Sequence, residues 1–225
     1  MFDRIAGRYD LLNHLLSAGI DRRWRTRAVR ALSLSGREVV LDLCTGTGDL
    51  AIAAARHARG PRRVVGIDFS SEMLGVAQRK LRGAAIEGSV ALVRGDAVRL
   101  PIADGAVDAV TIGFGIRNVE DVTAACSEIF RVLAPGGRLA VLEFATPTVP
   151  VLGAAYVWYL HEILPRLGRL ISGDASAYSY LPASIDTFGS ADEFVKILRH
   201  AGFSDARGDP LTLGTVMLYT ARRNR

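Results

Sequence analysis

Cysteine is scarce in the sequence and long apolar runs are absent, and both features exclude whole classes of protein. The two cysteines among 225 residues, Cys44 and Cys126, give neither a disulfide framework nor the spacing of a metal site. No uninterrupted apolar run approaches the roughly 20 residues that a membrane-spanning helix needs. Residues 1–4 lack the apolar core of a signal peptide. We therefore expect a cytoplasmic protein that binds no metal and is either soluble or peripheral at the inner face of the cell membrane.

Lysine is almost absent as well. The 28 basic residues include two lysines, Lys80 and Lys196, so 26 are arginines, and the net charge is +5. These charges are scattered and form no basic stripe with interleaved aromatic residues, so we expect no nucleic-acid partner. Two clusters, residues 21–25 and 222–225, are suited to anionic lipid or simply to a solvated surface.

Residues 38–51 are the stretch around which the chain is organised. They indicate a buried strand, a turn that contains Gly46 and Gly48, and an alanine-rich helix over 49–59. Because glycine has no Cβ, a ligand can approach this turn closely, and the first amides of the helix are free to bind it. The turn is therefore the candidate cofactor site.

Two ligands and one structural alternative fit this turn. The pattern from Gly46 to Ala51 matches a dinucleotide fingerprint, and Asp68 lies where a ribose-binding acid belongs. Asp42, at the end of the strand, would repel a pyrophosphate but suits a cationic ligand such as S-adenosylmethionine. The alternative is a turn that only packs a helix onto a sheet.

The rest of the chain predicts one α/β domain. We expect strands over residues 39–43, 63–68, 90–93, 107–112 and 138–144, with helices after Ser70 and over 119–133. A helix over 191–201 and a hairpin of strands over 206–211 and 215–221 would follow, placing one antiparallel strand on the sheet. Helices over 9–17 and 20–32 are expected to form a flap over the edge of the sheet.

Other polar residues follow the predicted strands. Asp68 and Asp96 each end a strand, and Asp96 could accept a hydrogen bond from an adenine amino group, although a solvent-facing turn explains it equally well. The segment 113–118 carries two glycines beside Phe, Arg and Asn, a composition that suits a site wall better than a packed core.

Residues 146–190 are too long for an ordinary loop and hold six of the 16 aromatic residues. They predict either a helical hairpin that covers the sheet or a lid that lines an apolar substrate pocket, and the two interpretations are compatible.

Together these motifs resemble a class I S-adenosylmethionine-dependent methyltransferase, and more closely the ubiquinone/menaquinone biosynthesis C-methyltransferases. The superfamily pattern consists of Asp42-x-x-x-Gly46-x-Gly48, Asp68, Gly95-Asp96-Ala97 and Leu133-x-Pro135-Gly136-Gly137-Arg138. The family signatures include Tyr9-Asp10-x-x-Asn13, Trp24-Arg25, Phe114-Gly115-x-Arg117-Asn118, Leu142-Glu143-Phe144 and Tyr178-x-Tyr180-Leu181.

The resemblance implies a Rossmann-like, seven-stranded, mostly parallel sheet with helices on both faces. It implies a single domain with a helical flap over 1–35, a cofactor-binding core over 36–145, an insert over 146–190 and a final helix and hairpin over 191–225. The implied cofactor is S-adenosyl-L-methionine. Its expected contacts are Asp42, Gly46, Thr47, Gly48, Asp68, Asp96, Ala97 and Gly113, the last standing where many relatives carry Ser.

The implied reaction is methylation of a ring carbon on a polyprenylated quinol, with no metal. Arg117 and Asn118 are expected to bind the ring oxygens, with Arg117 stabilising a phenolate directly or through water unless it serves as a loop-anchoring ion pair. His161 is the candidate base, and Tyr9, Asp10, Tyr178 and Tyr180 are expected to line the pocket or lid.

The acceptor stays open between two rings. The sequence favours demethylmenaquinol, methylated in the last step of menaquinone biosynthesis, over a 2-methoxy-6-polyprenyl-1,4-benzoquinol of ubiquinone biosynthesis. Another small-molecule methyltransferase, a nucleic-acid methyltransferase, a non-catalytic cofactor-binding scaffold and a nicotinamide-dependent oxidoreductase are the alternatives. Contact with the membrane surface is expected because of the lipid tail, and a homodimer is left open.

Overall fold

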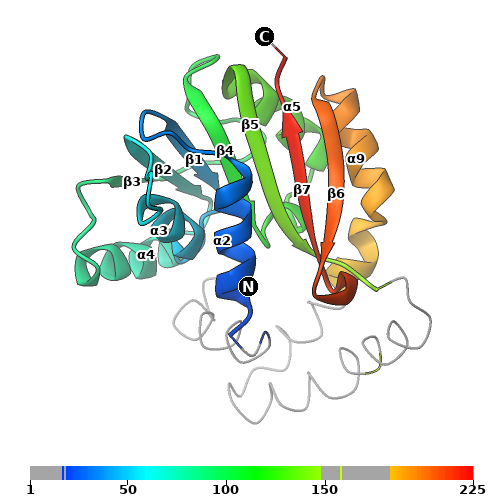
Figure 1. The fold of residues 1–225 in the computed structure, drawn as a ribbon, viewed down its shortest axis with the longest axis horizontal. Coiled ribbons are helices and arrows are strands. Elements are labelled where there is room, and N and C mark those ends of the chain that lie inside the picture. Colours follow the sequence, from blue (N-terminus) through cyan, green and yellow to red (C-terminus); the bar gives the residue numbers. More distant parts are fainter. Residues whose placement is uncertain (1–16, 18, 148–157, 159–182, 225) are drawn as a thin grey trace.

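A computed structural model describes residues 17, 19–147, 158 and 183–224. These residues form a twisted sheet of seven strands in the order β3-β2-β1-β4-β5-β7-β6. The strands are β1 Val39–Leu43, β2 Arg63–Asp68, β3 Val90–Arg94, β4 Val107–Gly113, β5 Leu133–Phe144, β6 Ser204–Leu211 and β7 Val216–Arg222. Only β7 runs antiparallel to its neighbours (Figure 1). The predicted seven-stranded, mostly parallel sheet with a final hairpin is therefore confirmed.

Helices cover both faces of this sheet (Figure 1). On one side lie α2 Asp21–Ala31, α3 Asp49–Ala55 and α4 Ser71–Gly83; on the other lie α5 Val122–Val132 and α9 Ala191–His200. The strands alternate between two buried apolar clusters, since Val40 belongs to the cluster that contains Trp24 of α2, while its neighbour Leu41 belongs to the cluster that contains Ile129 of α5. This double burial explains why the central strands are continuous apolar runs.

The helix α2 departs from the expected flap. Trp24, Ala28 and Val29 are almost fully buried in the cluster that also contains strand residues from β1, β4 and β5. The helix therefore covers the face of the sheet and forms part of its core, so its expected place at the edge is wrong. The other expected helix, over 9–17, lies outside the described residues except for its last position.

Several element ends differ from the sequence prediction for local reasons. The helix α3 ends at Ala55, because the amide of His57 bonds back to the Ala54 carbonyl and tightens the chain into a turn. The helix α5 starts at Val122, where the Asp121 side chain accepts a hydrogen bond from the Ala124 amide. As expected, Ser70 caps α4 by accepting from the Met73 amide. These caps fix where each helix begins.

The parallel register brings the chemistry-bearing residues to one edge. Asp42 of β1 lies beside Gly66 of β2 on one side and Thr111 of β4 on the other. In β5 the pairing moves from Leu133 opposite Val107 to Arg138 opposite Ala109, so residues 134–137 bulge out of the ladder. In the described part of the chain, no helix is both long and apolar enough to cross a membrane.

Candidate active site

A cavity of about 500 Å³ opens at the carboxyl ends of β1, β2 and β4. Open parallel sheets bind ligands at this edge, next to the point where the strand order reverses. The cavity collects most of the residues that the sequence singled out: Asp42, Gly46, Thr47, Asp68, Asp96, Ala97, Gly113 and Asn118.

Asp42 lies at the base of this cavity with only 1% of its surface exposed. Its two carboxylate oxygens accept hydrogen bonds from the hydroxyls of Thr45 and Thr111, each at 2.6 Å. Burial raises the pKa of Asp42 to about 6, although these hydrogen bonds and one from the Ala51 amide oppose the rise. A cation in the cavity would favour the charged carboxylate, as the sequence suggested.

The glycine turn is tied to the neighbouring strand end by Asp68. One carboxylate oxygen accepts from the Gly46 amide at 2.7 Å, and the other accepts from the Ser70 amide at 2.9 Å. The side chain is thereby fixed at the cavity wall between β1 and β2. Gly46 has φ +54°, and a Cβ built on it would meet nothing within 4 Å, so the turn leaves open space for a ligand.

Gly48 also has a packing role. It has φ +83° and precedes α3, and a Cβ there would come within 3.1 Å of the Ala77 side chain of α4. It is not among the residues that line the described cavity. Its lack of a side chain therefore lets the start of α3 approach α4, and its expected contact with the cofactor stays a prediction.

The third strand end supplies a mixed polar and apolar wall. The Asp96 carboxylate accepts from the Val98 amide at 3.1 Å, and Ala97 and Val98 line the cavity beside it. Across the opening, Phe69 is 69% exposed, and the Arg94 guanidinium lies 5.6 Å from its ring centre. An exposed aromatic ring beside a carboxylate suits a flat heterocycle with an amino group.

The segment after β4 closes the cavity from the other side. Phe114 adopts φ +59°, and a Cβ on Gly115 would lie 2.4 Å from the Cys44 Cβ, so the two turns touch. Burial raises the pKa of the Cys44 thiol, and nearby Asp68 and Asp42 raise it further, so the thiol stays neutral. Asn118 lines the cavity, and its side-chain amide lies 3.5 Å from the Phe114 carbonyl oxygen.

Arg117 and Asn118, expected to act as a pair, have different surroundings. The Arg117 guanidinium forms an ion pair with Glu143 at 2.7 Å, and the two side chains are 5% and 0% exposed. It also donates to the Phe114 carbonyl at 2.5 Å and to the Ser184 hydroxyl at 3.1 Å. Arg117 is absent from the described cavity lining. These contacts match the loop-anchoring ion pair that the sequence analysis held as the alternative.

An ionic network at the cavity rim was not anticipated. Arg25 of α2 lines the cavity and forms ion pairs with Asp21 and with Asp49, the latter at 3.1 Å. Lys80 of α4 pairs with the same Asp49 and donates to the Thr47 hydroxyl at 3.2 Å. The available signal was the Trp24-Arg25 signature, whose arginine follows a buried tryptophan.

The remaining candidates cannot be placed in this geometry. Tyr9, Asp10, His161, Tyr178 and Tyr180 lie outside the described residues. Within the described ranges, no group of His, Cys, Asp or Glu side chains could hold a metal ion.

Comparisons with known proteins identify the family of this chain. The ubiE/COQ5 methyltransferase family matches residues 1–223. The chain is 50% identical over 225 residues to the ubiquinone/menaquinone biosynthesis C-methyltransferase UbiE of Syntrophotalea carbinolica, covering 100% of this chain and 93% of that protein. It is 47% identical over 223 residues to the demethylmenaquinone methyltransferase of Thermus thermophilus, covering 99% and 100% of the two chains.

The fold is also that of solved methyltransferases. A methyltransferase crystallised with the Trm112 activator of Haloferax volcanii has a TM-score of 0.72 at 22% identity, covering 100% of this chain and 98% of that chain. An S-adenosylmethionine-dependent methyltransferase from Aquifex aeolicus has a TM-score of 0.65 at 18% identity, covering 88% and 89%. The expected Rossmann-like class is confirmed. The chain therefore belongs to the ubiE/COQ5 methyltransferase family and uses S-adenosylmethionine as its cofactor.

Proposed function

We propose that the protein methylates a ring carbon of demethylmenaquinol, a polyprenylated quinol, to give menaquinol. The observation that carries this proposal is the 47% identity to the Thermus thermophilus demethylmenaquinone methyltransferase, which extends over the whole of both chains. The cavity at the carboxyl edge of the sheet is consistent with this proposal, because the cavity is lined by several carboxylates and by apolar side chains.

The residues present fit the cofactor. Asp68 and Asp96 offer carboxylate oxygens to hydroxyl and amino groups, Phe69 and Ala97 offer apolar contact, and the open space over Gly46 admits the ligand backbone. Asp42, hydrogen-bonded beneath the turn, places negative charge near a cationic centre. When bound, S-adenosylmethionine supplies an electrophilic methyl group, so no metal is needed for the reaction.

The protein must orient the ring and exclude water. In this proposal, Asn118 contacts a ring oxygen from the cavity wall. Arg117 is a positioning residue, since its bonds to Glu143 and to the Phe114 carbonyl hold the loop that presents Asn118. The sequence left Arg117 open between stabilising a phenolate, directly or through water, and anchoring its loop by an ion pair, and the buried pair with Glu143 favours the anchoring role.

The residues outside the described ranges keep the roles that the resemblance gave them. We propose that His161 acts as the base that removes a quinol proton, and that Tyr9, Asp10, Tyr178 and Tyr180 line the acceptor side of the pocket. We also propose that the segment over 146–190 covers the acceptor and its tail. Because that tail is lipid-soluble, contact with a membrane surface follows from the proposed substrate.

The test is methyl transfer from labelled S-adenosylmethionine to chemically reduced demethylmenaquinone, with the oxidised quinone as the control. Label in the reduced naphthoquinone alone supports the proposal. Cofactor binding without label in any quinol would refute it.

A second acceptor follows from the name of the Syntrophotalea carbinolica relative, which covers ubiquinone as well as menaquinone biosynthesis. A reduced 2-methoxy-6-polyprenyl-benzoquinone in a parallel reaction distinguishes the two. Label in both rings would mean an enzyme shared by the two pathways.

A further inference from the structure

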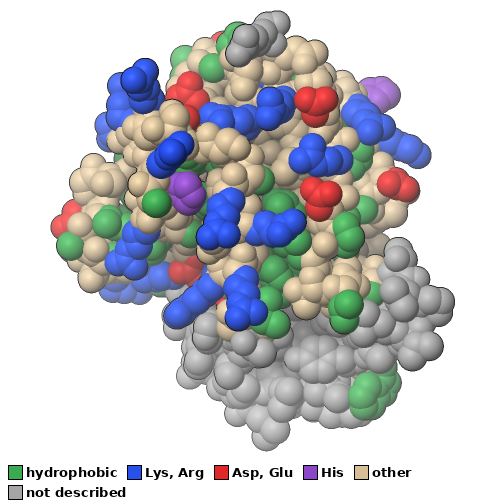
Figure 2. Space-filling view, in the orientation of Figure 1, with side chains coloured by type: hydrophobic (Ala, Val, Ile, Leu, Met, Phe, Trp, Pro, Cys, Tyr) green, Lys and Arg blue, Asp and Glu red, His purple; other side chains and the backbone are tan. Residues whose placement is uncertain are grey.

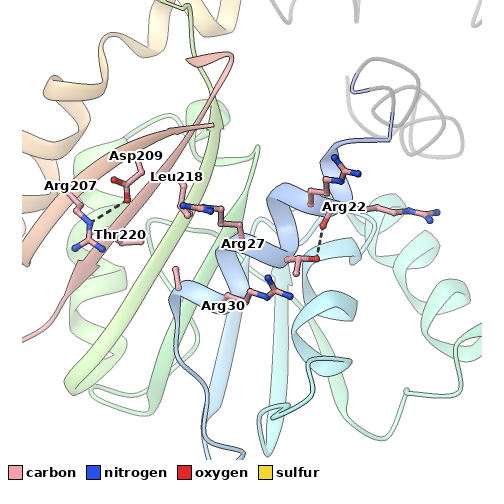
Figure 3. A pocket seen from close by; sticks show the side chains of 10 residues that line it. Arg22, Arg27, Arg30, Arg207, Asp209, Leu218 and Thr220 are labelled. Carbon is pink, nitrogen blue, oxygen red and sulfur yellow. Dashed lines mark hydrogen bonds and ion pairs between the residues drawn. The ribbon is translucent and has the colours of Figure 1, made fainter. Parts of the chain in front are cut away.

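A groove beside α2, over the sheet face that this helix flanks, carries an unusual charge. Its volume is about 680 Å³, and its walls are α2 on one side and β6 and β7 on the other (Figure 3). Four arginines of α2, namely Arg22, Arg23, Arg27 and Arg30, face it together with Arg207 of β6, and Asp209 is the one acidic residue among the described lining. The groove is separate from the cofactor cavity, with which it shares no lining residue.

The amino-acid pattern explains why these arginines gather there. Trp24, Ala28 and Val29 take the buried face of α2, so Arg23, Arg27 and Arg30, at spacings of four and three, share the exposed face. On β6 and β7, Arg207 lies opposite Thr220 and Asp209 opposite Leu218 in the antiparallel register, on the sheet face that α2 flanks. In the view of Figure 1, no described helix crosses in front of these two strands.

The positive charge in this groove is largely uncompensated. Among the residues that the structure describes, none forms an ion pair with Arg23, Arg27 or Arg30, whereas Arg25 on the same helix is paired with Asp21 and Asp49. Arg207 pairs with Asp209 at 3.4 Å, but both side chains are about half exposed. Figure 2 shows that basic side chains gather across this face. Guanidinium groups in such an array match the oxygens of phosphate esters.

The floor of the groove and its surroundings are not purely ionic. Leu218 and Ala31 line it, and the hydroxyl of Thr220 has no hydrogen-bond partner within the described part of the chain. The β6–β7 hairpin ends in η3, Thr212–Gly214, where Leu213 is 73% exposed and adopts φ +59°. The Trp24 indole donates to the Thr212 hydroxyl at 2.8 Å, so this apolar tip is fixed beside α2. The exposed leucine, held in a strained conformation, and the cationic groove beside it together form an amphipathic surface.

We propose that the groove and the Leu213 tip dock the protein onto an anionic phospholipid surface, with the arginines on the phosphate-bearing headgroups and Leu213 among the acyl chains. Nucleic acid is a poorer fit, because no aromatic residue of the described lining offers a stacking surface. The hairpin tip follows the carboxyl end of β6, which runs parallel to β5, so it lies at the sheet edge where the cofactor cavity opens. This inference rests on the proposed function in one respect: docking would bring the open edge of the cavity to an acceptor that lies in the lipid.

The test is sedimentation with vesicles of phosphatidylcholine alone or containing 30% phosphatidylglycerol, at low salt and without cofactor or quinol. The groove variant is Arg23→Gln, Arg27→Gln and Arg30→Gln together. The control variant changes Arg59, Arg62 and Arg82, three exposed arginines elsewhere, to Gln, and so lowers the net charge equally. Each arginine near an anionic surface raises the affinity for that surface by roughly a factor of five, so the groove variant, which lacks three, should bind about 100-fold more weakly. The control should bind like the unchanged protein.

A second variant tests the apolar tip. Leu213→Gly relieves a backbone conformation with positive φ, so it should fold at least as well while binding the anionic vesicles about tenfold more weakly. Equal thermal midpoints and equal S-adenosylhomocysteine affinity would show that all variants are folded.

The inference is overturned if the groove variant binds anionic vesicles like the unchanged protein, or if the control variant loses as much. It is equally overturned if inorganic phosphate, a short DNA duplex or an acidic protein occupies the groove while vesicles do not. Failure of the proposed function is distinguishable, because it would appear as absent methyl transfer with vesicle binding intact.

Discussion

Arg117 offers the sharpest test of how the site is held together. Its guanidinium and the Glu143 carboxylate are 2.7 Å apart and almost wholly buried. Removing one partner of a buried pair leaves the other charge uncompensated, at a cost of about 3–5 kcal/mol. We expect Arg117→Met to lower the free energy of unfolding by that amount, because Glu143 would stay buried with the amides of residues 117 and 144 as its only donors among the described residues.

The double variant Arg117→Met with Glu143→Gln removes both charges and keeps a neutral acceptor for those amides. It should be more stable than Arg117→Met alone, with a coupling energy of about 2 kcal/mol between the two sites. The measurement is urea unfolding followed by circular dichroism. Arg207→Met, which breaks an exposed pair with Asp209, is the control and should cost less than about 1 kcal/mol.

Turnover in the same variants separates two roles for Arg117. If Arg117 only positions the loop, the double variant should regain much of the methyl-transfer activity as it regains stability. Direct contact with the acceptor predicts a stable double variant that remains inactive. A loss of less than about 1 kcal/mol in Arg117→Met would refute the buried-pair reasoning itself.

Three further predictions concern the cavity. Because burial raises the pKa of Asp42 to about 6 from an ordinary 3.8, the folded state keeps a proton that the unfolded state releases, so the unfolding free energy should fall by about 2 kcal/mol as the pH rises from 4 to 6. Asp42→Asn should flatten that decline in urea unfolding across the same pH range, and an unchanged slope would exclude Asp42 as its source. We propose that Arg25, at the cavity rim, binds the amino-acid carboxylate of the cofactor, so Arg25→Gln should weaken S-adenosylhomocysteine about tenfold in calorimetry. It should leave 5′-methylthioadenosine, which lacks that carboxylate, unaffected, and equal losses would contradict this. Gly115→Ala should cost about 1–3 kcal/mol and weaken cofactor binding, because the new Cβ would meet Cys44 at 2.4 Å, whereas Gly83→Ala, with nothing within 4 Å, should be neutral or stabilising.

The strands were predictable because their cause is local. The apolar run over Arg63–Asp68, bounded by a turn and an N-cap serine, predicts its strand to the residue. The acids that follow the strands converge because parallel pairing brings their carboxyl ends to one edge. That is why the residues quoted for cofactor binding meet in one cavity, with Gly48 as the exception.

The features that the sequence left open or misplaced have non-local causes. Whether Arg117 points at a ligand or at Glu143 depends on two residues 26 positions apart and on one rotamer. The close approach of α4 to Gly48 cannot be read from the glycine turn alone. The place of α2 depends on the packing of Trp24 and Ala28 in the apolar cluster on the sheet. The arginines of α2 carry no sequence signal of a groove, because its other wall comes from strands about 180 residues later.

The position of β7 has a consequence for folding during synthesis. It occupies the interior of the sheet between β5 and β6, yet it is the last of the described strands to be synthesised. Until β7 has left the ribosome, β5 therefore presents an open, apolar edge, and β6 lacks the neighbour with which it pairs. Completion of the sheet waits for β7, and the nascent chain must be protected from aggregation until that strand is in place.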